Sequence, residues 1–349
     1  MFVVVLIGTH AQYLEHDSGT FHPESPSRIT AVLEGVRRAG LEDQLRFFTP
    51  TEADPGSLEA VHAQEYLINL QRFCVMGGGA IDSDTTVSDQ SFRAAVLAAG
   101  AGLDAIKKLQ AGEADSAFLV VRPPGHHATS STAMGFCLIN NVAVSVAHLV
   151  SQGNKVAVID FDAHHGNGTQ DVFYQSDKVL YVSTHQHPLY PGTGRVQELG
   201  AEDGFGYTVN LPVPEGSSGE TVRAALEIVA QPVIELFSPD WIVISAGFDG
   251  HYKDPLTNLG LTAKDFYEMT SWATSFVRKG HTLVFLEGGY DLDALRDSTT
   301  ATLGALAGEL ILPKEDEVRG KVSHETVESL AESRKRALGD RDPYLGTKH

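Results

Sequence analysis

Short, continuously apolar runs alternate with longer helical stretches along most of this sequence, and this alternation constrains the fold more than any other feature. Several runs carry β-branched residues at consecutive positions, a pattern typical of strands buried on both faces of a parallel sheet. The predicted strands are residues 3–7, 117–121, 155–160, 179–183, 207–211, 241–245 and 282–286. The predicted helices are residues 27–39, 57–73, 90–109, 140–151, 219–237, 263–279 and 293–310. The pattern predicts a three-layer α/β fold.

Charge and cysteine content narrow the class of protein. The 349 residues hold 26 Lys and Arg against 45 Asp and Glu, a net charge of −19. This excess weighs against a nucleic-acid or anionic-membrane binder, because both need a basic face. Two cysteines, Cys74 and Cys137, cannot make a disulfide framework and indicate a reducing compartment. The opening MFVVVLIGTH resembles a first or edge strand rather than a signal peptide or membrane span, so we expect a cytoplasmic protein.

The chain shows no internal repeat, low-complexity tract or linker rich in proline and serine. We therefore expect one catalytic domain over residues 1–312. The charged remainder, residues 313–349, is predicted to be a peripheral tail with one helix. No pattern in the sequence indicates the oligomeric state of the protein.

Polar sequence follows four of the predicted strands directly. RPPGHH begins at Arg122, DFDAHHGN at Asp160, AGFDGH at Ala246 and EGGYD at Glu287. Ligands of open α/β sheets bind at the carboxyl ends of the strands. Four such segments at one edge of one sheet predict an active site there.

The segment that follows the predicted strand over residues 155–160 contains candidate metal ligands. Asp162 and His164 are two residues apart, so in an extended segment both side chains leave one face. Asp249, also at a strand end, is the natural third ligand. Two carboxylates and one imidazole leave a position for water, as in catalytic zinc sites. The alternative is that Asp162 caps a helix and Asp249 closes a turn, which fits each residue alone better than both together.

A histidine pair and a tyrosine could supply the proton transfers of such a site. His126 and His127 follow a Pro-Pro-Gly turn, from which both can face one cavity, and histidine is the side chain best suited to exchange protons near neutral pH. Asp160 and Asn167 are candidate partners that orient one imidazole each. Tyr290, after two glycines, could donate a hydrogen bond to an oxyanion. Alone, the pair would fit an ordinary loop and the tyrosine a packed core. GxSxG, HExxH, GxxxxGK[ST] and GxGxxG motifs are absent.

Taken together, these stretches closely resemble the zinc-dependent histone deacetylase family. The similarity is strongest to its class II-like members and to bacterial histone deacetylase-like and acetylpolyamine amidohydrolases. The matching strings are HPESPSRI, RPPGHHATSSTAMGFCLINNVAVS, VIDFDAHHGNGTQDVFY, VSTHQHPLYPGTG, ISAGFDGHYKDPL and LEGGYD. They span roughly residues 8–310. The resemblance implies a three-layer arginase/deacetylase-like fold with a central, mostly parallel sheet of about eight strands.

The resemblance also implies a role for each matched residue. Zinc would bind to Asp162, His164 and Asp249. His127 would be the general base and then acid, His126 its neighbour held by Asp160, and Tyr290 the group that stabilises the oxyanion. Phe136 and Tyr190 would wall a tunnel for an acyl-lysine side chain, with the Gly135 carbonyl accepting its amide N–H. Potassium would bind at two sets of residues: Asp160, Asp162, His164, Ser183 and Thr184; and Phe173, Ser176, Val179 and Tyr207. Arg28 matches a buried arginine behind the site.

Four positions distinguish this chain within the family pattern. Asn167 stands where class I members carry aspartate, and an amide should elevate the proton affinity of His127 less than a carboxylate does. Tyr290 is retained, which favours deacetylase activity. Leu256 stands where a polyamine-selective branch carries glutamate, and Tyr190 adds a hydroxyl to the tunnel. The acidic loop Asp82-Ser83-Asp84 would either lie on the tunnel rim or form a plain turn.

The function predicted from these features is zinc-dependent removal of an acetyl or related acyl group from acyl-lysine in proteins. An acylated polyamine or another small amide is the alternative substrate. A binuclear manganese ureohydrolase would need further carboxylates where Gly166 and His251 stand. A non-catalytic acyl-lysine binder would have lost the water-activating residues, yet His126, His127 and Tyr290 are all present.

Overall fold

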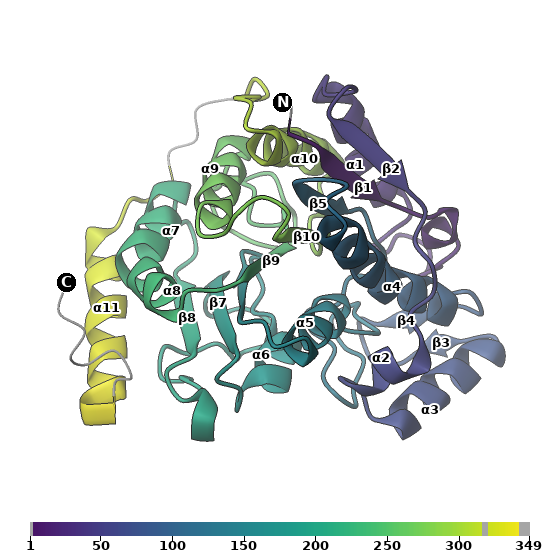
Figure 1. Cartoon of the computed structure of the whole chain (residues 1–349), viewed down its shortest axis with the longest axis horizontal. Helices are drawn as coiled ribbons and strands as arrows, with labels where there is room; N and C mark the ends of the chain where they lie inside the picture. The colour runs from purple at the N-terminus through teal and green to yellow at the C-terminus, as the bar shows by residue number, and fades with distance from the viewer. Residues whose placement is uncertain (1–2, 316–319, 342–349) are drawn as a thin grey trace.

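The computed structural model describes residues 3–315 and 320–341, and an eight-stranded, all-parallel sheet forms its middle layer (Figure 1). The strand order is β2-β1-β5-β10-β9-β6-β7-β8. The strands are β1 (Val5–Gly8), β2 (Leu45–Phe48), β5 (Ser116–Leu119), β6 (Val156–Asp160), β7 (Val179–Gln186), β8 (Thr208–Val213), β9 (Trp241–Ala246) and β10 (Thr282–Leu286). Every residue of β5, β6, β7, β9 and β10 is buried, which explains the continuous apolar runs.

Helices cover both faces of the sheet, as Figure 1 shows. One face carries α1 (Ser27–Arg38), α7 (Gly219–Ala225), α8 (Gln231–Phe237), α9 (Ala263–Thr274) and α10 (Leu292–Ala307). The other carries α4 (Ser91–Gln110), α5 (Asn141–Ser151) and α6 (Asn167–Phe173). Beyond α4 lie α2 (Pro55–Glu59), α3 (Gln64–Val75) and a small hairpin of β3 (Gly79–Ala80) and β4 (Thr86–Val87). The predicted three-layer fold is confirmed, with a sheet that is wholly parallel.

Several local predictions were wrong in instructive ways. β2 was not predicted, because it is an edge strand whose Arg46 and Phe47 are exposed, so it lacks a continuous apolar run. β2 also makes β1 an interior strand rather than an edge strand. The predicted helix over residues 57–73 is two helices, since Ala63 is extended and its N–H donates to the Ser130 oxygen. The predicted helix over 219–237 is confirmed with these bounds, although it contains a π-helical turn at Leu226–Ala230. This turn ends two residues before Pro232, which has no N–H for a helical bond.

The charged C-terminal segment includes a docked helix, α11 (His324–Leu338), beside α7 and β8. Lys321 pairs with Gly216 and Ser218 through backbone hydrogen bonds. Arg334 is buried and donates to the Gly206 and Thr208 oxygens. Residues 316–319 and 342–349 lie outside the described residues, and the division into a domain and a tail stays a prediction. None of the helices in the described ranges combines the length and apolar composition needed to cross a membrane.

A buried ion cluster ties the N-terminal loop to the sheet. The fully buried Glu24 carboxylate accepts hydrogen bonds from Arg122 Nε at 2.6 Å and from Arg28 at 3.2 Å. Arg28 also donates to the Gly289 oxygen at 2.7 Å, beside the end of β10. Burial alone would raise the pKa of Glu24, but Arg122, His16 and Arg28 outweigh it and hold the pKa well below its usual range. Buried charges of this kind are tolerated because each has partners.

We expect Glu24→Gln to lower the free energy of unfolding at pH 7 by about 3–5 kcal/mol, since it leaves two buried guanidinium groups without their counter-charge. Because the pKa of Glu24 is lower in the folded than in the unfolded chain, its carboxylate stabilises the fold above the ordinary value of 4.5. That stabilisation is lost as the pH falls below this value. Urea unfolding followed by circular dichroism should therefore show a difference that shrinks between neutral pH and pH 4 or below.

Glu34→Gln is the matched control, because Glu34 pairs with Arg37 and Arg38 on the surface. Exposed ion pairs contribute little, so this variant should unfold almost as the unaltered chain does. A destabilisation by Glu24→Gln that stayed constant with pH would contradict the assigned role of its charge.

Candidate active site

Three predicted metal ligands converge at the carboxyl edge of the sheet, on the loops that follow β6 and β9. The ligand atoms of Asp162, His164 and Asp249 all lie within 4.8 Å of one another. His164 Nδ1 lies 2.7 Å from Asp249 Oδ2 and 3.3 Å from Asp162 Oδ1. The three side chains are almost entirely removed from solvent. The structure therefore brings together the three residues that the sequence singled out.

The reason for their convergence differs from the expected strand alternation. β6 ends two residues before Asp162, so Asp162 and His164 lie in a loop, where backbone N–H groups orient the carboxylates. The Ala163 N–H donates to Asp249 Oδ1 and the Gly288 N–H to Asp162 Oδ2, each at 2.8 Å. A Cβ at Gly288 would lie 2.6 Å from Oδ2 of both carboxylates. Glycine at this position thus leaves room for the two acids to approach.

The donor set fits a divalent cation. Burial and the neighbouring Asp162 raise the pKa of Asp249 to about 7. Burial would lower the pKa of His164, but the two carboxylates outweigh it and raise the pKa to about 10. Two carboxylate oxygens and one imidazole nitrogen are the ligands of a catalytic zinc with an open position.

The two adjacent histidines have different partners. His126 Nδ1 lies 3.1 Å from Asp160 Oδ2, and His127 Nδ1 lies 2.8 Å from Asn167 Oδ1. Burial would lower the pKa of His126, but Asp160 and nearby carboxylates raise it to about 10. Burial and the positive charges of His126 and His164 hold the pKa of His127 well below its usual range. Because the Asn167 oxygen only accepts, His127 carries its proton on Nδ1, and Nε2 is left as a free base.

A cavity of about 240 Å³ leads to these groups. Its lining residues are Asp84, His127, Gly135, Phe136, His164, Leu189, Tyr190, Leu256 and Tyr290. The Phe136 and Tyr290 rings stand edge to face at 5.7 Å, and Tyr190 stands edge to face with His127 at 5.2 Å. A Cβ at Gly135 would lie only 2.5 Å from His127 Cδ2. Position 135 therefore requires glycine, because the cavity wall approaches the His127 ring closely there.

Tyr290 is fixed from two sides. Its N–H donates to Asp254 Oδ2 at 2.7 Å, and the Arg28 guanidinium lies 5.0 Å from its ring centroid. Burial raises the pKa of the phenol well above its usual value, and Arg28 offsets only part of this. The hydroxyl is thus a proton-bearing hydrogen-bond donor beside the three ligands.

Two supporting acids received no role in the sequence analysis. Asp254 accepts the N–H groups of Tyr290 and Asp291, at 2.7 and 3.3 Å. Glu287 is fully buried and accepts the N–H groups of Gly125 and His126, at 2.7 and 3.2 Å. Glu287 directly follows β10, whereas Asp254 lies eight residues after the end of β9. The pattern did not show that each would hold another segment's backbone.

The acidic loop over residues 82–84 both forms a turn and contributes to the cavity, the two alternatives offered for it above. Asp82 Oδ1 accepts the N–H groups of Asp84 and Thr85, which closes a turn, whereas Asp84 lines the cavity. The structure also places members of the two predicted potassium-binding sets close together. Asp160 on β6 lies opposite Ser183 on β7, and the Ser176 N–H donates to the Phe173 oxygen at the end of α6. The role of the two residue sets as potassium ligands stays a prediction.

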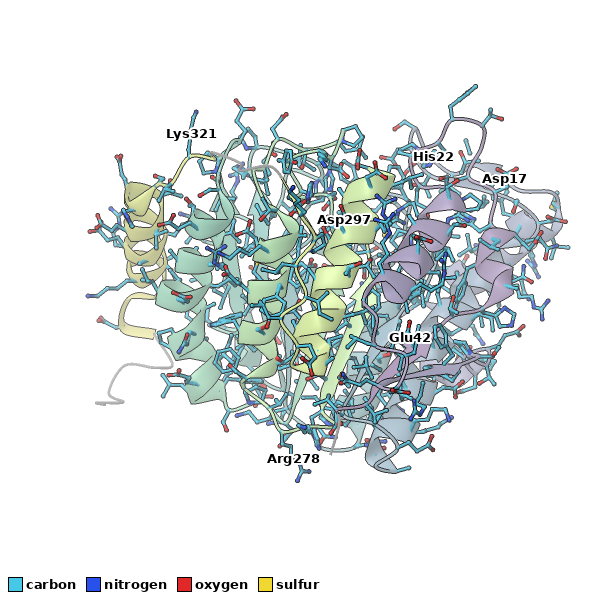
Figure 2. All side chains as sticks on the ribbon, turned by 90° about the horizontal axis from the view of Figure 1, so that it is seen from above. Asp17, His22, Glu42, Arg278, Asp297 and Lys321 are labelled. Carbon is cyan, nitrogen blue, oxygen red and sulfur yellow. The ribbon has the colours of Figure 1, made fainter. Side chains whose placement is uncertain are left out.

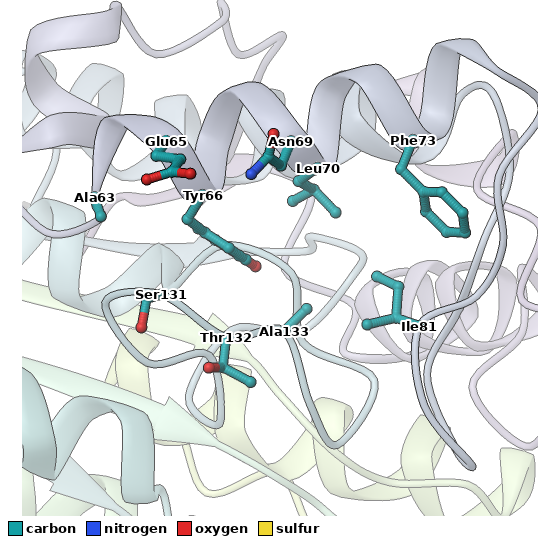
Figure 3. A pocket seen from close by; sticks show the side chains of 10 residues that line it. All are labelled: Ala63, Glu65, Tyr66, Asn69, Leu70, Phe73, Ile81, Ser131, Thr132 and Ala133. Carbon is teal, nitrogen blue, oxygen red and sulfur yellow. The ribbon is translucent and has the colours of Figure 1, made fainter.

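A larger hollow of about 430 Å³ lies elsewhere, between α3 and two loops (Figure 3). Figure 3 shows Glu65, Tyr66, Asn69, Leu70 and Phe73 on the helix, with Ser131, Thr132, Ala133 and Ile81 opposite. Its lining residues include neither a histidine nor a pair of carboxylates. The smaller cavity, which holds the converging acids and imidazoles, is therefore the candidate active site.

Comparisons with known proteins agree with this assignment. A family model described as "Histone deacetylase domain" matches residues 22–306. The chain is 40% identical over 309 residues to a "Probable deacetylase" of Archaeoglobus fulgidus, covering 86% of this chain and 85% of that protein. It is 36% identical over 332 residues to "Histone deacetylase 7" of Homo sapiens, covering 85% of this chain but 35% of that protein. The crystal structure of the HDA15 HD domain superposes with a TM-score of 0.87 at 35% identity, covering 96% of this chain and 94% of that one.

We expect the purified chain to bind about one zinc ion after chelator treatment and reconstitution, measured by atomic emission. Asp249→Asn should weaken zinc affinity at least about 100-fold in competition with a chromophoric chelator, because it removes a charged ligand. Asp240→Asn, at the amino-terminal end of the same strand, is the matched control and should leave affinity unchanged. Two manganese ions per chain, or zinc binding unaffected by Asp249→Asn, would refute the assigned ligand set.

Proposed function

This chain belongs to the histone deacetylase family, and we propose that it hydrolyses the amide of acetyl-lysine or a related acyl-lysine in proteins, with zinc held by Asp162, His164 and Asp249. Family membership makes it a hydrolase. The observation that carries the proposal is the pair of adjacent imidazoles, of which His127 lines the cavity and His126 lies 4.0 Å away, ring centre to ring centre. His126 has a carboxylate partner and a raised pKa, whereas His127 has an amide partner and a lowered one. Such separation of proton affinities assigns distinct roles to neighbouring groups.

Zinc, when bound there, supplies a Lewis acid that polarises the amide carbonyl and acidifies water. His127 Nε2 then takes the proton of the attacking water, since it is neutral and its other nitrogen is held by Asn167. The Tyr290 hydroxyl donates to the developing oxyanion. The charged His126 stabilises that negative charge from behind. Protonated His127 finally gives its proton to the amine nitrogen, and the C–N bond breaks.

The cavity walls fit an unbranched alkyl chain that ends in an amide. Phe136 and Tyr190 present ring faces or edges, and Leu189 and Leu256 add aliphatic surface. We assign the Gly135 carbonyl, at the narrow part of the wall, to the substrate amide N–H. Leu256 brings no charge to pair with a second ammonium group, which favours lysine over a polyamine. An acylated polyamine is the second candidate, because the Asp84 carboxylate at the same cavity could pair with its distal ammonium.

Acetate release tests the proposal most directly. The zinc-loaded chain should release acetate from an acetyl-lysine peptide faster than from acetylspermidine. Tyr290→Phe should lower kcat about 100- to 1,000-fold with little change in KM, because it removes a donor that acts mainly in the transition state. Tyr267→Phe, on α9, is the control and should leave kcat unchanged. Zinc-loaded protein that released acetate from neither substrate, or full activity in Tyr290→Phe, would sink the proposal.

The amide partner of His127 predicts a measurable pH effect. Asn167→Asp places a carboxylate 2.8 Å from His127 Nδ1 and should raise the pKa of this imidazole by about 1 unit or more. His127 must be neutral to accept a proton, so the acidic limb of the kcat/KM profile should move to higher pH. Asn154→Asp, in the turn between α5 and β6, should leave the limb in place. An unmoved limb in Asn167→Asp would show that His127 is not the base.

A further inference from the structure

The loop over residues 17–24 is held firmly at its base. Ser18 Oγ donates to the Glu24 oxygen, and the Gly19 N–H donates to Asp17 Oδ1 at 2.9 Å. Glu24 is itself fixed by the buried Arg122. Figure 2 shows Asp17 and His22 at the opposite end of the molecule from Arg278, which lies just before β10 begins. The loop therefore stands on the side of the carboxyl ends of the strands, where the cavity opens.

One arm of this loop forms part of the cavity rim. The His22 ring stands edge to face with Phe136 at 4.7 Å, and His22 Nε2 lies 3.0 Å from the Asp84 oxygen. Phe136 and Asp84 both line the candidate active site. His22 Nδ1 accepts the Glu24 N–H at 3.1 Å, so the imidazole is fixed from both sides. The residue before His22, Phe21, thus lies one position from the rim.

Phe21 combines a fully exposed aromatic side chain with an unfavourable backbone conformation. Its side chain is fully exposed, at 101%, whereas the exposed aromatic Phe47 on β2 retains 60%. Its φ is +64°, in the left-handed region that a bulky residue rarely adopts and that glycine or asparagine tolerates. Strained backbone positions cluster at ligand-binding sites, and the apolar surface of the ring is removed from water when another molecule covers it.

We infer that Phe21 determines substrate specificity by packing on an apolar side chain next to the acyl-lysine of a polypeptide. This inference rests on the proposed function and deepens it. With the acyl-lysine side chain in the cavity, its backbone lies at the rim, and each neighbouring residue of an extended chain is about 3.3–3.6 Å further on. A side chain one or two positions away reaches the ring. An acylated polyamine carries no branch that could do so.

The test uses two acetyl-lysine peptides of equal length and charge, one with leucine and one with glycine on both sides of the lysine, and acetylspermidine as a third substrate. Phe21→Asn removes the ring but suits the left-handed backbone. It should raise KM for the leucine peptide about 5- to 30-fold, the loss expected for part of a buried aromatic surface. kcat should stay within about twofold, and KM for the other two substrates should hardly change. Phe21→Leu should recover part of the loss, and Phe47→Ala should behave as the unaltered chain.

Equal KM values for the leucine and glycine peptides in the unaltered chain would overturn the inference. An equal rise for all three substrates in Phe21→Asn would also overturn it, because it would indicate a distorted rim. If the unaltered chain hydrolysed none of them, the proposed function would fail. Fluorescence anisotropy with the labelled peptides would then still decide whether Phe21 prefers the leucine peptide, by the same 5- to 30-fold criterion for Kd.

Discussion

The buried negative charge of Asp162 and Asp249 is the constraint on which the rest of the site depends. Two carboxylates held so close in the protein interior repel each other and lose their hydration. The chain compensates with the N–H groups of Ala163 and Gly288, with the His164 imidazole, and with space for a divalent cation. Because the two acids and these donors come together from the loops after β6, β9 and β10, the site can form only after the sheet has brought these three strands side by side.

A second set of buried charges lies behind the first and connects it to the substrate side. Glu24 joins Arg122 and Arg28, and Arg28 reaches the backbone of Gly289 and the ring of Tyr290. The same Glu24 fixes the loop that carries the rim. Glu24 is thus a shared partner of the arginine beside Tyr290 and of the loop that reaches the cavity entrance.

Much of the fold and site could be predicted from the sequence, for identifiable reasons. Strands with continuous apolar runs were predicted because burial on both faces leaves no other pattern, and β2 was not because Arg46 and Phe47 face solvent. The residues after the strand ends were recognisable because parallel strands present them at one edge. The supporting acids Asp254 and Glu287 were not assigned, because their partners are backbone N–H groups of distant segments, which leave no trace in residue type.

The sheet order determines which parts of the molecule can unfold locally without disturbing the site. β10, β9 and β6, at whose ends the converging acids and Tyr290 lie, are adjacent in the sheet. Three strands (β5, β1 and β2) lie on one side of them and two (β7 and β8) on the other. The edge strand β2, whose Arg46 and Phe47 are exposed, can open transiently without separating the central three, since local unfolding begins where burial is least. The loops of the site are therefore attached to the fully buried strands β6, β9 and β10, whose backbone hydrogen bonds open least often.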